Sequence, residues 1–199
     1  MTAQEIKGWC PGAYRPMESG DGLIVRVRPP LGRLTDQQAA GVADLADTFG
    51  NGVIETTNRA NLQLRGVSKK GYPDLLERLN ELALLPRDAE AEGRLNITID
   101  PFHGGSGSRA LKIAAGLAEG LAASDFRRLP SKFGLLIDPG PMRRLYGSSG
   151  DIHIEASGDR LIVRADGLRD GAPVRDEAEA RDFALDLARW FVTSGGIGD

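Results

Sequence analysis

Four polar side chains lie close together in the segment Thr56–Val67: Arg59, Asn61, Gln63 and Arg65. If a strand begins at Asn61, the two-residue period of strands places Asn61, Gln63 and Arg65 on one face, with Arg59 just before it. Guanidinium groups bind carboxylates through paired hydrogen bonds, so this face suits a ligand that carries several acidic groups. The alternative is a polar strand face that only meets water.

Other cations are placed to extend such a surface. Arg26 and Arg28 lie two residues apart at the end of an apolar run, so both are expected on one side of a strand. They add positive potential to the polar face if that strand pairs beside residues 61–67, and they are ordinary exposed charges otherwise. Arg15 lies in a Gly- and Pro-rich N-terminal arm and is expected either to reach the site or to dock the arm.

Metal and thiol chemistry have little support in the sequence. Cys10 is the one cysteine, so the chain forms no internal disulfide and cannot alone hold a [4Fe–4S] cluster, which takes about four thiolates. Cys10 is expected to pack as a small apolar residue. His153 alternates with Ile152 and Ile154 and is expected on the outer strand face, while His103 falls in a predicted loop. Their positions give no spacing typical of metal ligands.

The composition narrows the class of protein. The chain has 199 residues, of which 41% are hydrophobic, which suits one large domain or two small ones. A net charge of −3 argues against general nucleic-acid binding, which needs a basic face. We find no apolar run long enough for a membrane helix and no signal-peptide pattern, and therefore expect a cytoplasmic protein.

Periodicity and turn residues predict the elements that position these side chains. Thr35 with Gln38 three residues later forms a capping box that starts a helix. Strands are expected at 22–28, 53–56, 61–67, 95–99, 133–137, 151–156 and 160–165, and helices at 35–49, 72–85, 109–123 and 176–192. This order predicts an α+β fold: a ferredoxin-like half-domain with its N-terminal arm (1–86), a linker (87–93), and a larger α/β lobe (94–199). A flexible loop at 104–108 is a weaker site for an anion.

Four segments resemble a known family. They are Lys-Gly-Trp-Cys-Pro-Gly-Ala-Tyr-Arg-Pro-Met (7–17), Ser-Gly-Asp-Gly-Leu-Ile-Val-Arg-Val-Arg-Pro (19–29), Thr-Thr-Asn-Arg-Ala-Asn-Leu-Gln-Leu-Arg-Gly (56–66) and Leu-Pro-Ser-Lys-Phe-Gly-Leu-Leu-Ile (129–137). Together they are similar to the N-terminal half of precorrin-3B synthase, a cobalamin-pathway relative of the sirohaem nitrite and sulfite reductases. The resemblance covers nearly the whole chain.

The resemblance implies a function and its partners. Members of the family repeat this unit twice and enclose a tetrapyrrole between the halves, and the second repeat carries the cluster cysteines. The chain is therefore expected to bind a precorrin tetrapyrrole for dioxygen-dependent hydroxylation and lactone formation. The [4Fe–4S] cluster and the iron are expected from a missing half or a second subunit. The alternative is a non-catalytic tetrapyrrole-binding or assembly module, which as a homodimer would copy the two-repeat arrangement.

The resemblance also suggests roles for single residues. Arg59 matches the arginine that contacts the macrocycle carboxylates, and Lys132 matches the lysine of the Pro-x-Lys-Phe motif. Gly134 departs from the reductases, which commonly carry a second lysine there; this weakens any expectation of sulfite or nitrite reduction. No catalytic residue is assigned. The expected tetrapyrrole-binding set is Arg59, Arg65, Asn61, Gln63, Lys132, Arg26, Arg28 and Arg15.

Overall fold

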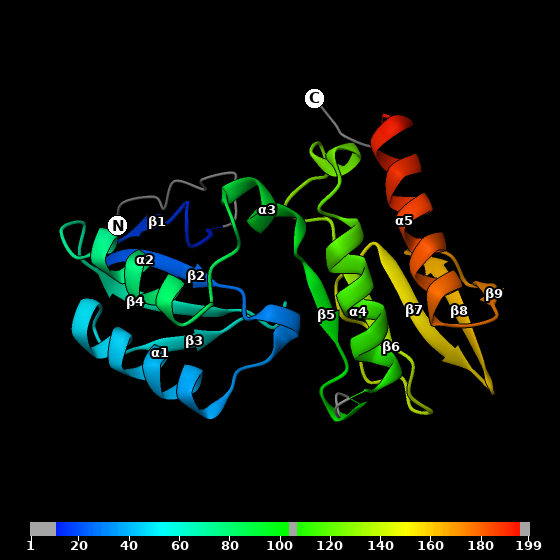
Figure 1. Cartoon of the computed structure of the whole chain (residues 1–199), viewed down its shortest axis with the longest axis horizontal. Helices are drawn as coiled ribbons and strands as arrows, with labels where there is room; N and C mark the ends of the chain where they lie inside the picture. The colour runs from blue at the N-terminus through cyan, green and yellow to red at the C-terminus, as the bar shows by residue number, and fades with distance from the viewer. Residues whose placement is uncertain (1–10, 104–106, 196–199) are drawn as a thin grey trace, which may run out of the picture.

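The computed structural model describes residues 11–103 and 107–195 of the chain. Two sheets stand side by side, and each carries a pair of helices on one face (Figure 1). Each sheet also has its own cluster of buried apolar residues. The predicted α+β fold, a ferredoxin-like half-domain followed by an α/β lobe, is confirmed. The separate cores support a boundary near the predicted one, which remains a proposal.

The N-terminal unit is a four-stranded antiparallel sheet in the order β1-β2-β4-β3. Its strands are β1 (Met17–Ser19), β2 (Gly22–Val27), β3 (Ile54–Thr56) and β4 (Leu62–Val67), and its helices are α1 (Asp36–Phe49) and α2 (Tyr72–Glu81). Val25, Val27, Leu64 and Val67 are fully buried beneath the helices. The other face of this sheet carries Arg26, Gln63 and Arg65, as the alternation predicts.

The predicted helix starts are confirmed more closely than the ends. Thr35 caps α1 through the capping box with Gln38. Pro73 lies in the first turn of α2, where its missing N–H costs little. The sequence prediction carried α2 on to residue 85, but the helix ends at Glu81 because Ala83 adopts a left-handed conformation with φ of 54°.

The C-terminal unit is a five-stranded mixed sheet in the order β5-β6-β7-β8-β9. The first three strands run parallel and the last two complete antiparallel pairs, including the predicted β7–β8 hairpin. Its strands are β5 (Ile97–Ile99), β6 (Leu135–Asp138), β7 (Ile152–Ser157), β8 (Arg160–Ala165) and β9 (Ala172–Val174), and its helices are α4 (Arg109–Gly120) and α5 (Glu177–Thr193). Short 3-10 turns lie at η1 (Pro30–Gly32), η2 (Pro101–His103) and η3 (Ser124–Phe126). In the part of the chain that is described, no helix is long and apolar enough to cross a membrane.

The segment predicted as a linker contains a structural joint. Helix α3 (Ala89–Arg94) occupies it, and its Glu92 is only 3% exposed. The Glu92 carboxylate accepts the backbone N–H groups of Ala13 (2.6 Å) and Tyr14 (3.2 Å) and pairs with Arg28 at 2.9 Å. One carboxylate therefore ties the N-terminal arm, the end of β2 and α3 together.

Candidate functional site

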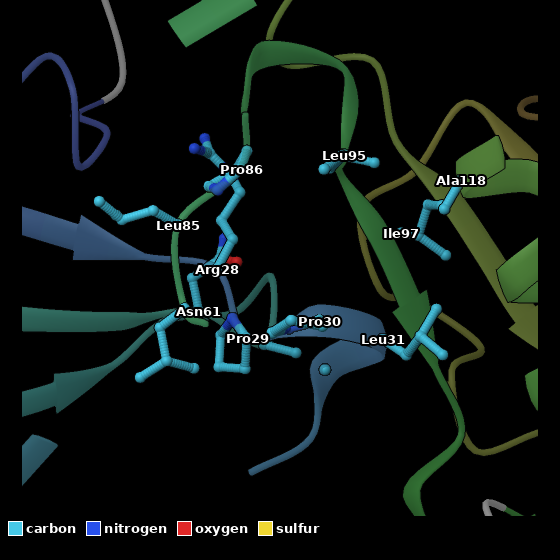
Figure 2. Close-up of a pocket in the computed structure, with 13 residues that line it drawn as sticks. Arg28, Pro29, Pro30, Leu31, Asn61, Leu85, Pro86, Leu95, Ile97 and Ala118 are labelled. Carbon is cyan, nitrogen blue, oxygen red and sulfur yellow. The ribbon is translucent and has the colours of Figure 1, made fainter. Parts of the chain in front are cut away.

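Two adjoining cavities lie between the units. Their volumes are about 270 and 420 Å³, and both are bordered by Leu31, Gly32 and Ala60. In the smaller cavity, Leu95 and Ile97 of the C-terminal unit face Arg28 and Leu85 of the N-terminal unit (Figure 2). Its lining is mostly proline and leucine. The larger cavity has a more polar lining, which includes Thr57, Asn58, Thr98 and Asp100. Such a mostly apolar hollow with a few polar groups is typical of a small-molecule site.

A tight turn after β3 brings the polar motif to these cavities. The Thr57 hydroxyl accepts the N–H groups of Arg59 (3.3 Å) and Asn61 (3.2 Å), and the Thr57 N–H donates to the Asn61 carbonyl at 2.9 Å. Ala60 takes the left-handed conformation that closes the turn, with φ of 53°. The turn therefore presents Asn58 and Ala60 to the larger cavity and Asn61 to the smaller one.

Asn61 lines the smaller cavity, whereas Arg59 lies on the same turn but is not among the residues that line either cavity. Among the described residues, the half-buried Arg59 guanidinium makes no hydrogen bond and no ion pair. The Asn61 side chain is 6% exposed, and its Nδ2 has no hydrogen-bond partner there either. A buried donor without a partner costs about 1–3 kcal/mol, which a ligand oxygen would recover.

Arg26, Gln63 and Arg65 lie together, but on the uncovered sheet face and not on the walls of these two cavities. Arg26 donates to the Gln63 side-chain oxygen at 2.7 Å, and Gln63 donates to Glu55 at 3.0 Å. Arg65 makes two contacts with the Asp21 carboxylate, at 3.2 and 3.3 Å. Side chains of this chain, namely Gln63, Glu55 and Asp21, thus engage the donors that the sequence analysis assigned to a ligand. A ligand role for Arg26, Gln63 and Arg65 stays a prediction.

The remaining three predicted residues are dispersed. Arg28 borders the smaller cavity, but its buried side chain is held by Glu92. Lys132 is exposed in the turn before β6. Arg15 is exposed in the N-terminal arm. The structure therefore does not gather all eight residues into one site. Cys10 and most of the loop at 104–108 lie outside the described residues.

A row of buried acids is the feature that sequence reasoning missed. Asp138 and Glu155 are register partners on β6 and β7, and Asp100 follows Ile99, which pairs with Ile137. All three acids are at most 3% exposed. They lie at the carboxyl ends of three parallel strands, where ligands commonly bind in α/β sheets. Even so, among residues 11–103 and 107–195 no three acidic, histidine or cysteine side chains gather closely enough to hold a metal ion.

His153 lies on the sheet face opposite α4 and α5, as the alternation predicts, but it is buried there. His153 is 5% exposed, with Nδ1 3.5 Å from Glu155 and Nε2 3.3 Å from Asp166. The reason is the segment 139–150, which follows β6 and covers the sheet face opposite α4 and α5. Its Arg143 lies 3.6 Å from Glu155. Alternation identified the face correctly but gave no sign that a loop covers it.

The pKa values of Glu155 and Asp138 shift in opposite directions because the two side chains have different partners. Burial would raise the pKa of Glu155, but the hydrogen bond and charge of Arg164, together with Arg143, outweigh it and lower that pKa. Burial raises the pKa of Asp138, and the neighbouring Asp100 and Glu155 charges raise it further. The Leu145 N–H, which donates to Asp138 at 2.8 Å, offsets part of this rise.

Asp138→Asn is therefore expected to stabilise the chain at neutral pH. Because the pKa of Asp138 is higher in the folded than in the unfolded chain, its stabilising contribution is complete below about pH 4 and is lost as the pH rises through the folded value. Asparagine keeps an acceptor for the Leu145 N–H without a charge. Urea unfolding at pH 8 and pH 4 should show a more stable variant at pH 8 and a smaller difference at pH 4. A variant less stable than the parent at pH 8 contradicts the assignment.

Comparison with known proteins identifies the family that this chain resembles. Residues 15–82 match the nitrite/sulfite reductase ferredoxin-like half domain. A precorrin-3B synthase from Sinorhizobium sp is 38% identical over 162 residues, covering 78% of this chain and 34% of the relative. The chain belongs to the nitrite/sulfite reductase superfamily of oxidoreductases. The chain spans about a third of the length of the first curated relatives that it matches.

Other superfamily members support the assignment. The ferredoxin–nitrite reductase of Synechococcus elongatus is 29% identical over 153 residues, covering 72% of this chain and 30% of that protein. The structure of the Mycobacterium tuberculosis NirA protein superposes with a TM-score of 0.63 at 20% identity, covering 89% of this chain and 36% of that one. This structural likeness shows that the two chains share a fold over most of this chain.

Proposed function

We propose that this chain is the tetrapyrrole-binding repeat of a precorrin-3B synthase-like oxidoreductase in cobalamin biosynthesis. The observation that carries the proposal is the uncommitted Arg59 guanidinium on the turn that borders both inter-unit cavities. The identity of 38% with a precorrin-3B synthase supports it. Precorrins carry several acetate and propionate arms, so charge-assisted bonds to arginine suit them.

Each part of the site has a physical role in this proposal. Arg59 binds one carboxylate arm, and the Asn61 amide donates to a ligand oxygen. The proline and leucine walls of the smaller cavity exclude water from the ring edge, which strengthens both contacts. Dioxygen-dependent hydroxylation and lactone formation need redox groups. A chain with one cysteine does not fit a [4Fe–4S] cluster, so we propose that a second repeat or subunit supplies the cluster and the iron.

Gly134 favours this branch of the superfamily over the reductases. A Cβ atom at Gly134 would lie 3.0 Å from Asn96 Nδ2 and 3.3 Å from the Gly150 Cα. Both are closer than ordinary van der Waals contact. The loop before β7 thus packs on the position where the resemblance places a second reductase lysine.

Gly134→Lys is therefore expected to destabilise the chain by about 1–3 kcal/mol, the usual cost of overpacking. Chemical denaturation measures this loss. Gly20→Lys is the control, because a Cβ atom at Gly20 would meet open space. Gly158→Lys is a poorer control, because the positive φ of Gly158 (60°) would itself strain a lysine. Equal stability of Gly134→Lys and the parent would remove the packing argument.

Titration of the purified chain with uroporphyrin, an eight-carboxylate macrocycle, tests the proposal directly. We expect saturable binding, seen as a shift in porphyrin absorbance, that is much tighter than binding of an acyclic tetracarboxylate. The acyclic acid separates recognition of the ring from simple charge attraction. No binding of the porphyrin, with or without a cluster-bearing partner, would exclude the proposed function.

The second candidate is a non-catalytic assembly module, which the single cysteine favours. Such a module would pair with a second repeat, a subunit or a second copy through the uncovered face of the N-terminal sheet. Light scattering combined with an iron assay separates the two readings. An iron-free homodimer that does not bind porphyrin supports the module.

A further inference from the structure

Three large apolar side chains are strongly exposed on the loops that follow β5 and β6. Phe102 is 75% exposed, Tyr146 76% and Met142 62%. Phe102 directly follows Pro101, and Tyr146 directly follows Leu145; both Pro101 and Leu145 line the larger cavity. Phe102 and Tyr146 are thus the immediate chain neighbours of two lining residues, although they are not themselves part of the lining. Burying such apolar surface against a ligand is favourable.

We propose that Phe102 and Tyr146 form an aromatic rim on which the flat face of the tetrapyrrole rests, with Arg144 as a positioned cation beside it. This inference rests on the proposed function and assigns it residues from the C-terminal unit. The tetrapyrrole then bridges the two units: Arg59 holds an arm from one side, and the rim supports the ring from the other.

The size of the cavities requires contacts of this kind. Pockets for drug-sized ligands span about 300–1,000 Å³, and a tetrapyrrole with its acid arms is a large ligand by that measure. The larger cavity holds about 420 Å³. Part of the macrocycle must therefore lie across the mouth, where it meets the rim. Aromatic rings and a guanidinium are the side chains best suited to a flat conjugated surface.

The row of buried acids holds this rim in place. Asp100 accepts the N–H of Phe102 at 3.0 Å and lies 3.6 Å from Arg144. The Arg144 guanidinium stacks over the Phe102 ring, 4.6 Å from its centroid. On the neighbouring strand, Asp138 accepts the N–H of Leu145, next to Tyr146. Adjacent strand ends thus fix both loops, so little ordering is needed when a ligand binds.

A patch of this kind could alternatively bind another protein. The continuity of the rim with the cavity favours the macrocycle, because a protein surface would leave the cavity behind it unfilled. Arg144 also favours an acid-armed ligand, because a cation at the mouth attracts carboxylates.

The test is titration of Phe102→Ala, Tyr146→Ala and the double variant of the full chain with uroporphyrin. We expect each single change to weaken binding about 3- to 10-fold, the usual range for loss of an aromatic contact, and the double change to weaken it further. Affinity for the acyclic tetracarboxylate should not change. Trp190→Ala, which removes a 66% exposed aromatic on α5, should bind the porphyrin like the parent.

The outcomes separate the rim from the proposed function. If the parent binds porphyrin and Arg59→Ala weakens it while the rim variants bind normally, the rim is overturned and the proposed function stands. If the parent does not bind porphyrin, both fail. Phe102→Tyr and Tyr146→Phe keep the rings and should retain affinity; their loss of affinity would contradict a stacking role. Rim variants that change self-association but not porphyrin affinity would identify a protein-contact surface and overturn the proposal.

Discussion

Glu92→Ala is expected to lower the free energy of unfolding by about 3–5 kcal/mol, the usual cost of breaking a buried ion pair on one side. The change removes the carboxylate that pairs with Arg28, whose side chain is 8% exposed, and that accepts the Ala13 and Tyr14 N–H groups. Urea unfolding measures the loss. Because the same carboxylate joins the arm, β2 and α3, we also expect faster proteolysis within residues 11–16.

The control is Glu81→Ala, which removes an exposed ion pair with Arg78 and should cost at most about 0.5 kcal/mol. If Glu92→Ala does not fold, Glu92→Gln, which keeps an acceptor of the same shape, gives the measurable intermediate loss. A Glu92→Gln protein as stable as the parent would show that the charge of this joint is not needed.

Arg59→Ala is expected to weaken uroporphyrin binding about 10- to 150-fold, which corresponds to about 1.5–3 kcal/mol for one charge-assisted contact. The stability of this variant should change little, because the Arg59 guanidinium makes no hydrogen bond or ion pair with another described residue. Arg59→Lys should recover part of the affinity, since it restores the charge but not the paired donors.

Arg65→Ala is the matched control, because this arginine lies a few residues away but is already bound to Asp21 and Ser19. We expect its porphyrin affinity to fall less than that of Arg59→Ala, because Arg65 would have to leave Asp21 to bind a ligand carboxylate. The opposite ranking, with Arg65→Ala the weaker binder, would move the site to the uncovered sheet face. Equal affinities for both variants and the parent would remove arginine recognition altogether.

Local signals in the sequence were sufficient for most of the fold. The Thr35 capping box and the alternation in residues 62–65 are rules of one helix turn and one strand, and the structure confirms both. The alternation does not continue to Val67, which is buried like Leu64 because the β2–β4 register shifts between them. Strands β1 and β9 were missed because β1 (Met-Glu-Ser) has no β-branched or aromatic residue and β9 (Ala-Pro-Val) contains a proline.

The parts of the site that the sequence did not predict depend on tertiary contacts. Nothing in the Ala- and Glu-rich segment 87–93 distinguishes the buried Glu92 from the exposed Glu90, because the difference comes from the arm packed against it. The acid row is likewise invisible along the chain, since Asp100, Asp138 and Glu155 become neighbours only through strand register. The same holds for Arg65, whose partner Asp21 is far away in sequence.

Hydrogen–deuterium exchange of the chain with and without uroporphyrin would show where the macrocycle binds. Binding between the two units predicts slower exchange at 29–34, 57–61, 98–102 and 145–148, the segments that border the two cavities and the rim. The β1–β2 hairpin on the far side of the N-terminal sheet should exchange unchanged. Protection confined to β1, β2 and β4, with none at 57–61 or 145–148, would contradict a tetrapyrrole site between the units.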